Sequence, residues 1–251
     1  MNHENNVKNN SGLGIPERIR VLRYHRITAD GERTQMHGMC LPAKVFTSHL
    51  DLLERWGFTT ITFNDYRLFL VGKLNLPRKP VILTFDGAYL DNYSVMFPIL
   101  RRFGATAVVF AHGDRNIKED VWHSDPRVPR AAMMNDQNLL ELNAAGIEIG
   151  SQAMTHPDLT SLESEQAAEE IIRSRILLEI LLNAPVLSFA YPFGMVNDKV
   201  KQMVAEAGYS IACCVNSGPS AFGHDHLEVR RITMKDDSNA FRFGLRLFLC
   251  G

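Results

Sequence analysis

This sequence has few cysteines and no long apolar run, and both shortages limit what the protein can be. The four cysteines are Cys40, Cys213, Cys214 and Cys250, and none forms a C-x-x-C pair. The sequence therefore predicts neither a disulfide framework nor a zinc knuckle. No apolar run approaches the roughly 20 residues that a helix needs to cross a bilayer, so no membrane span is expected.

Net charge is also nearly absent. With 27 Lys and Arg against 28 Asp and Glu, the formal charge is -1 at pH 7, which gives no electrostatic argument for nucleic acid or an anionic membrane as partner. The first residues, MNHENNVKNNSG, lack the basic start and apolar core of a secretory signal. We expect a cytoplasmic protein as the sequence is written, with export by a leader outside it left open.

A chain of 251 residues is long enough for one large α/β domain or two small ones. Its composition, 45% hydrophobic and 22% charged, is that of an ordinary globular protein. Residues 1–15 hold almost nothing to bury and predict a disordered tail, and no linker divides residues 16–251. Strands and helices alternate through most of this domain, which predicts an α/β fold with a parallel sheet, open or closed into a barrel. The predicted strands are 19–25, 58–63, 81–85, 105–110, 147–150, 186–191, 211–215 and 228–234; the predicted helices are 42–56, 64–70, 91–103, 136–145, 161–183, 197–207 and one in the tail from 236.

Three of these helices carry further signals. Phe46, Leu50, Leu53 and Trp56 recur at helical spacing and predict an apolar stripe that packs in the core. Asn64 can cap the helix 64–70, and Thr160 with Glu163 has the spacing of a capping box for the helix 161–183.

The stretch PVILTFDGAYLDNY, residues 80–93, organises the chain. Val81 to Phe85 is short, β-branched and aromatic, as is typical of a buried strand, and it ends in Asp86 before a Gly-Ala step. In α/β proteins the carboxyl ends of strands are where sites gather. Asp86 is therefore a candidate site residue, although a helix-capping role is an equally good interpretation of this residue alone.

Four segments together resemble the polysaccharide deacetylase family, the carbohydrate esterases that remove N- or O-acetyl groups from glycans. VILTFDGAYLDNY is similar to the family motif T-F-D-D-G-Y followed by D-N-Y, and EIGSQAMTHPDLT is similar to E-I-G-S-H-T-x-T-H-P-x-L. FAYPFG resembles the third motif, and VLRYHRI and VRRITM resemble the opening strand and a late R-I segment. The match covers about residues 19–234 in the family's order. It implies a distorted (β/α) barrel, usually with fewer than eight strands, and an active site at the carboxyl ends of the strands.

The resemblance also implies a reaction. In the family a divalent metal, commonly zinc, is held by one Asp and two His, polarises the acetyl carbonyl and lowers the pKa of a bound water. A neighbouring Asp acts as base, and a backbone N–H of the third motif stabilises the oxyanion. Carried onto this sequence, the catalytic positions are Asp86 and Tyr191, and His156 is a retained metal ligand. The substrate-binding positions are His25, Asp91, Pro192, Phe193 and Gly194.

Two metal-ligand positions depart from the family pattern. Gly87 stands where the metal-binding Asp is expected, and Gln152 stands where the first His ligand is expected. Neither glycine nor a neutral amide replaces a carboxylate or an imidazole. Loss of one supporting residue around a metal already lowers affinity about 10- to 100-fold, so the loss of two direct ligands predicts a still larger effect.

Three functional hypotheses remain. The first is a family member that binds N-acetylated glycan with metal-dependent deacetylation impaired or lost, as in a pseudoenzyme. The second is an active de-N-acetylase with a weak or relocated metal site, drawn from His25, Asp86, His112 and His156. The third is a structural partner of an active deacetylase, which would use the exposed face of FRFGLRLFLCG. A structural interpretation of Asp91 and Asn92 as helix caps, and of His156 as bonded within its turn, also stays open.

Overall fold

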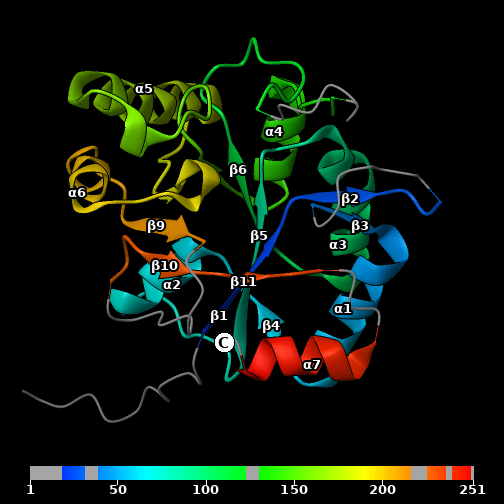
Figure 1. Cartoon of the computed structure of the whole chain (residues 1–251). Coiled ribbons are helices and arrows are strands. Elements are labelled where there is room, and N and C mark those ends of the chain that lie inside the picture. The colour runs from blue at the N-terminus through cyan, green and yellow to red at the C-terminus, as the bar shows by residue number, and fades with distance from the viewer. Residues whose placement is uncertain (1–18, 32–38, 123–129, 216–224, 236–238, 250–251) are drawn as a thin grey trace, which may run out of the picture.

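The fold is built around one parallel sheet, drawn in Figure 1 from a computed structural model that describes residues 19–31, 39–122, 130–215, 225–235 and 239–249. The predicted tail, residues 1–15, lies outside this part. The strands are β1 (Arg20–Tyr24), β2 (Arg26–Thr28), β3 (Cys40–Pro42), β4 (Thr59–Thr60), β5 (Pro80–Asp86), β6 (Val108–Ala111), β7 (Glu148–Ser151), β8 (Ser188–Ala190), β9 (Ile211–Cys214), β10 (Val229–Arg230) and β11 (Ile232–Thr233). The α-helices are α1 (Ala43–Arg55), α2 (Phe63–Leu70), α3 (Phe97–Phe103), α4 (Asp136–Ala144), α5 (Ser164–Leu182), α6 (Asp198–Glu206) and α7 (Ala240–Leu249).

Eight parallel strands form a nearly closed barrel. Their order is β10-β9-β8-β7-β6-β5-β1-β11, with the short β4 added beside β5. The two ends of this path, β10 and β11, are separated in the chain only by Arg231, so the chain itself bridges the ends of the sheet. The expectation of fewer than eight strands is wrong, because the segment 228–234, predicted as one strand, divides into two that pair with opposite ends of the path.

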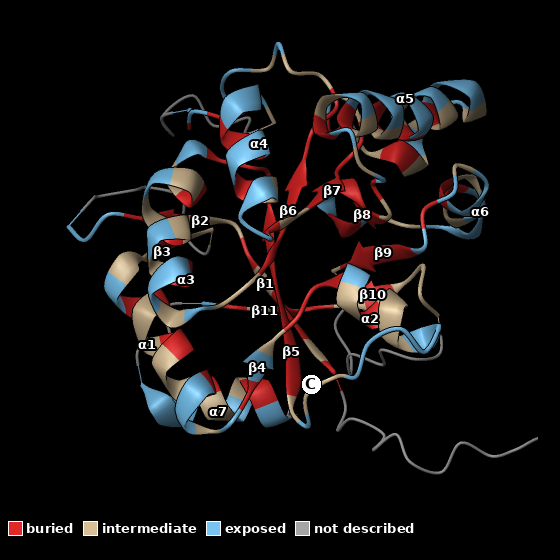
Figure 2. Ribbon diagram, turned by 180° about the vertical axis from the view of Figure 1, so that it is seen from behind, coloured by how far each residue is buried: buried red, intermediate tan, exposed pale blue. Residues whose placement is uncertain are grey.

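The core lies inside and around this barrel. All seven residues of β5 are buried, and Figure 2 shows the strands as the most buried part of the fold, with helices covering them outside. The predicted apolar stripe of α1 is confirmed, since Phe46, Leu50 and Leu53 are buried against the sheet. Because all the barrel strands run parallel, their carboxyl ends meet at one rim, which is where the predicted site residues follow the strands.

Two predicted helix starts differ from the structure. Thr160 was expected to cap a helix over 161–183, but it lies in a 3-10 turn (Leu159–Ser161) capped by Asp158, and α5 begins at Ser164. The Asp158 carboxylate accepts hydrogen bonds from both the Thr160 amide and hydroxyl, so the hydroxyl is already engaged. For α2 the cap is Thr62, in a capping box with Asp65.

The predicted helix 91–103 is divided into a π-helical turn (Asn92–Met96) followed by α3. Pro98 explains the change of pattern, because it has no N–H to continue the ladder and is tolerated only near a helix start. No side chain caps the π-helical turn, so the interpretation of Asp91 and Asn92 as helix caps is wrong. No helix in the described ranges is both long and apolar enough to cross a membrane.

Candidate active site

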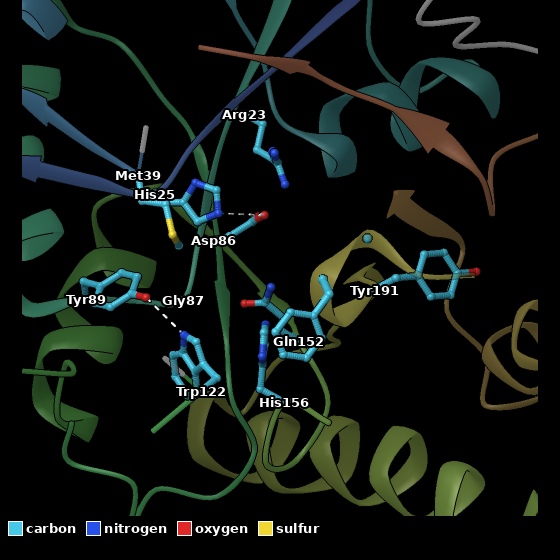
Figure 3. A pocket seen from close by; sticks show the side chains of 12 residues that line it. Arg23, His25, Met39, Asp86, Gly87, Tyr89, Trp122, Gln152, His156 and Tyr191 are labelled. Atoms are coloured by element: carbon cyan, nitrogen blue, oxygen red, sulfur yellow. Dashed lines mark hydrogen bonds and ion pairs between the residues drawn. The ribbon is translucent and has the colours of Figure 1, made fainter. Parts of the chain in front are cut away.

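A cavity of about 200 Å³ opens at the carboxyl ends of β1, β5, β7 and β8 (Figure 3). The residues that line it are Arg23, His25, Met39, Asp86, Gly87, Tyr89, Trp122, Gln152, His156, Tyr191, Phe193 and Gly194. It combines aromatic and aliphatic walls with a few charged groups, which is the usual composition of a small-molecule site.

Asp86 leaves the end of β5 and is held by Arg231 in a buried, two-pronged ion pair. The Arg231 Nη1 and Nη2 atoms donate to the two carboxylate oxygens at 2.6 and 2.8 Å, and Nη1 also donates to Thr84 Oγ1. Burial alone would raise the pKa of Asp86, but Arg231, His25 and Arg23 outweigh it and keep that pKa below its usual value. The carboxylate is therefore ionised at neutral pH and has little tendency to take up a proton.

His25 follows β1 and faces Asp86, with its Nε2 atom 4.0 Å from the carboxylate (Figure 3). Burial lowers the pKa of His25 to about 4, and the nearby Asp86 offsets this only in part. The imidazole is therefore neutral at pH 7. Its backbone is fastened by Asn92, whose amide donates to the His25 carbonyl at 2.7 Å and whose Oδ1 accepts from Ile27 N at 3.2 Å.

The structure does not place Asp91 on the cavity wall. Its carboxylate accepts a hydrogen bond from Arg26 Nε at 2.6 Å, in a mostly buried ion pair beside β2. Together with Asn92, it holds the segment after β1 against the turn that follows β5. Its role as a substrate-binding residue stays a prediction that this geometry does not favour.

An aromatic group forms the wall opposite Asp86. The ring centroids of His112 and Trp122 are 4.5 Å apart, those of Trp122 and His156 4.8 Å, and those of His156 and Phe193 4.6 Å. The Trp122 indole N–H donates to the Tyr89 hydroxyl at 3.3 Å. His112 lies behind the residues that line the cavity. Burial lowers its pKa well below the usual value, with His156 as the second cause, so the His112 ring is neutral at pH 7.

The residues at the family's metal positions do not fit a metal. Gly87 has no side chain, and a Cβ added to it would lie 2.5 Å from a ring carbon of Tyr89. Its φ of +99° is also one that side chains rarely adopt. Gln152 supplies a neutral amide, whose buried Oε1 has no hydrogen-bond partner among the described residues. Of the three positions that the resemblance assigns to ligands, only His156 carries a ligand side chain.

The third motif, after β8, turns sharply at the cavity edge. Tyr191 N donates to the Cys213 carbonyl at 3.0 Å and its hydroxyl to the Leu227 carbonyl at 2.8 Å; Figure 3 shows that hydroxyl pointing away from the cavity. Both Tyr191 donors are thus engaged within the fold, and its catalytic role stays a prediction. Pro192 is buried beneath the turn, whereas Phe193 and Gly194 line the cavity.

Backbone strain is concentrated around this site. Five non-glycine residues in the described ranges have positive φ, and four belong to the segments that form the cavity wall: Ala88, Ala153, His156 and Phe193. The fifth, Asn183, ends α5. Non-glycine residues in this region cost about 1–3 kcal/mol each and persist where the surroundings impose them, commonly at functional sites.

Five residues of the site were missed in the sequence: Arg23, Met39, Tyr89, Trp122 and Arg231. Arg23 did carry a signal, since a charged residue in the middle of the strand RVLRY must face something other than the apolar core. Trp122 carried none, because it lies in an irregular segment with no periodicity. Arg231 is 145 residues from Asp86 in the chain, and no local pattern links the two.

Comparisons with known proteins agree with this architecture. The chain matches the polysaccharide deacetylase family over residues 73–212, more than half of its length. It is 23% identical over 229 residues, covering 91% of this chain and 76% of the relative, to YxkH of Bacillus subtilis (strain 168), whose name carries a provisional assignment as a polysaccharide deacetylase.

Several solved structures are similar in fold, and two of them illustrate the likeness. The deacetylase PplD of Streptococcus pyogenes, solved with acetate, has a TM-score of 0.76 at 22% identity, covering 92% of this chain and 99% of that one. A de-N-acetylase of Aggregatibacter actinomycetemcomitans has a TM-score of 0.77 at 19% identity, covering 90% and 100%. At these identities the likeness shows the fold, while the match over residues 73–212 shows the family. The chain belongs to the polysaccharide deacetylase family.

Proposed function

We propose that this protein binds an N-acetylated glycan in the cavity and that metal-dependent deacetylation is lost or strongly impaired. The family implies an acetylated glycan as substrate and typically depends on a metal. The observation that carries the proposal is the bare backbone of Gly87, with the Tyr89 ring lying where a ligand side chain would begin.

The cavity wall supports the binding half of the proposal. The rings of Tyr89, Trp122 and Phe193 line it, and flat aromatic faces can stack on the C–H faces of a sugar ring. Phe193 is 52% exposed although its backbone is strained, so its ring is held at the edge at some energetic cost. Asp86, His25 and Gln152 add polar groups to the same cavity.

Binding can be measured through Trp122. The chain has two tryptophans, and Trp56 packs beside α7, on Phe243, outside the cavity. In a Trp56→Phe background, tri-N-acetylglucosamine should change the fluorescence of Trp122, with a Kd that EDTA does not alter. Trp122→Phe is the matched control and should show no signal. A Kd that rises sharply on adding EDTA contradicts metal-free binding.

Catalysis is tested by measuring the release of acetate from tri-N-acetylglucosamine in the presence of zinc or cobalt. We expect the native chain to show little turnover and a Gly87→Asp/Ala88→Gly/Gln152→His variant to show more. The new side chain at position 87 meets the Tyr89 ring, so that ring must change rotamer. The family motif T-F-D-D-G-Y has both an Asp at position 87 and a Tyr at position 89. Comparable turnover by the native chain overturns the proposal.

That outcome would favour a relocated metal site. One observation supports this second candidate: the rings of His112 and His156 are neighbours, with centroids 5.4 Å apart, and His112 Nε2 has no hydrogen-bond partner among the described residues. Asp86, whose carboxylate lines the cavity, has both oxygens bound by Arg231. His112→Gln and His156→Gln would then each abolish the native turnover.

A further inference from the structure

Two guanidinium groups, those of Arg23 and Arg231, lie near the Asp86 carboxylate at the edge of the cavity. Arg23, His25, Asp86 and Arg231 form this group, which we call the arginine cluster. Arg231 binds both oxygens of Asp86, and the side chain of Arg231 is fully buried. His25 is neutral, since burial keeps its pKa near 4. The cluster therefore carries two positive charges and one negative charge.

Arg23 is the member of the cluster that has no ion pair among the described residues. Its Nε and Nη2 atoms donate to Thr233 Oγ1 at 3.2 and 2.9 Å, and within the described ranges it makes no ion pair with a carboxylate. Its third nitrogen, Nη1, enters no hydrogen bond there. Arg23 lines the cavity, and Figure 3 shows its guanidinium extending toward the open space beside Asp86.

The orientation of Arg23 is set by the barrel. Arg23 in β1 and Thr233 in β11 are direct partners in the parallel ladder, so the bonds to the threonine hydroxyl connect two adjacent strands. A side chain held in this way is pre-organised for a ligand, because little rotamer freedom remains to be lost on binding.

The excess positive charge of the arginine cluster is electrostatically unfavourable. Burial lowers the pKa of Arg23 to about 10, and repulsion from Arg231 is the second cause, which Asp86 only partly offsets. A buried cation without a partner is costly, whereas a guanidinium that meets a carboxylate makes a strong charge-assisted hydrogen bond. An anionic ligand would thus relieve a cost already present in the fold.

We propose that Arg23 anchors a carboxylate and that the cavity accordingly prefers an acidic N-acetylated glycan, one with a carboxylate on or next to the sugar that enters it. This inference rests on the proposed glycan-binding function and names the substrate class. The same chemistry could be supplied by a small free carboxylate such as acetate, and the experiment separates the two sources.

The test compares three probes in the Trp56→Phe background. These are tri-N-acetylglucosamine, a tetrasaccharide that alternates N-acetylglucosamine with glucuronate, and sodium acetate. We expect the acidic tetrasaccharide to bind about tenfold more tightly than the neutral trisaccharide, as one charge-assisted hydrogen bond predicts. Arg23→Gln should reduce this preference to about twofold or less, and Arg23→Lys should restore part of it.

Arg20→Gln is the matched control. Arg20 starts the same strand and donates to the Leu247 carbonyl at 3.0 Å, and it does not line the cavity, so the acidic preference should be unchanged. Unaltered thermal melting of Arg23→Gln shows that its lost preference does not reflect lost folding.

Each outcome is decisive. Equal binding of the acidic and neutral saccharides, or an acidic preference that survives Arg23→Gln, overturns this inference and leaves the proposed function standing. Binding of acetate alone, abolished by Arg23→Gln, keeps the carboxylate anchor and overturns glycan binding. Binding of none of the three probes overturns both.

Discussion

At the scale of single residues, the cavity holds a neutral imidazole next to an ionised carboxylate. Asp86 keeps its negative charge because Arg231 binds both of its oxygens. His25 carries no charge, because the effect of burial on its pKa outweighs the attraction of the Asp86 carboxylate 4.0 Å away. The two side chains therefore respond to acid in different pH ranges, and the response of His25 comes first.

His25 should make the protein less stable in mild acid. Its pKa is about 4 in the folded protein against a reference value of 6.5, so between these values the unfolded chain binds more protons. Its contribution to stability is complete above pH 6.5 and is lost as pH falls toward 4. We expect urea midpoints measured from pH 7 to pH 4 to fall less steeply for His25→Gln than for the native chain. Parallel curves would show that His25 is not buried in its neutral form.

Single residues also show what local sequence can predict. Asp86 could be found because it ends a buried strand, and Gly87 and Gln152 could be found because a motif surrounds them. Arg231 could not be assigned as the partner of Asp86, since pairing depends on how β5 and the β10–β11 junction approach each other in the barrel.

At the scale of elements, the turn after β8 depends on one glycine. Gly194 has φ of +72°, and a Cβ there would lie 2.2 Å from Val215 Cγ2. Gly72, after α2, has nearly the same φ, +70°, with no atom within 4 Å of an added Cβ. Substitutions at Gly72 and Gly194 therefore separate the cost of backbone strain from the cost of a steric clash.

Gly72→Ala should cost about 1–2 kcal/mol of unfolding free energy from the backbone conformation alone. Gly194→Ala should cost about 1–3 kcal/mol more, because Val215 must move. Chemical denaturation of both variants measures the difference. Equal costs would mean that the turn after β8 relaxes freely, and the strained Phe193 would then not be held by its surroundings.

The attachment of α7 should depend on Phe243. This ring is fully buried, stacks on His49 with centroids 4.4 Å apart and contacts Trp56. Phe243→Ala should weaken docking by about 3–5 kcal/mol, as expected for loss of a buried aromatic ring. Hydrogen exchange of the α7 amides should become faster in this variant. Phe241→Ala, in the same helix at a position 74% exposed, should leave exchange unchanged, and equal effects would contradict the packing described here.

Element prediction succeeded where the pattern was long and periodic. The stripe of α1 and the apolar run of β5 depend on side chains whose spacing is visible in the sequence. Helix starts were less predictable, because Thr160 has the spacing of a capping residue but its hydroxyl is engaged by Asp158. Several residues can cap a helix, and tertiary packing selects among them.

At the scale of the whole molecule, Arg231 joins the two ends of the barrel. It lies between β10 and β11, is buried, and reaches across to Asp86 on β5. Its Nε also donates to the Cys214 carbonyl at the end of β9. The ion pair thus connects strands from both sides of the gap.

Breaking this pair should destabilise the entire fold. Arg231→Met leaves Asp86 buried and unpaired and should cost about 3–5 kcal/mol, with a similar loss for Asp86→Asn. The double variant should cost clearly less than the sum, because neither charge remains. A double-mutant cycle by denaturation measures this. Additive losses would contradict a direct pair.

The sequence by itself determined the alternation of strands and helices and indicated the family, because these follow from local periodicity and from the order of short motifs. The replacement of two metal ligands stays a prediction from the same motifs. Only the tertiary structure decided the number of barrel strands, the partner of Asp86 and the position of the Tyr89 ring against Gly87. It alone brought Arg23 to the cavity, where this residue makes no ion pair with any described residue. These properties depend on contacts between residues far apart in the chain, and such contacts are set by how the strands close around a common core rather than by any neighbouring residue.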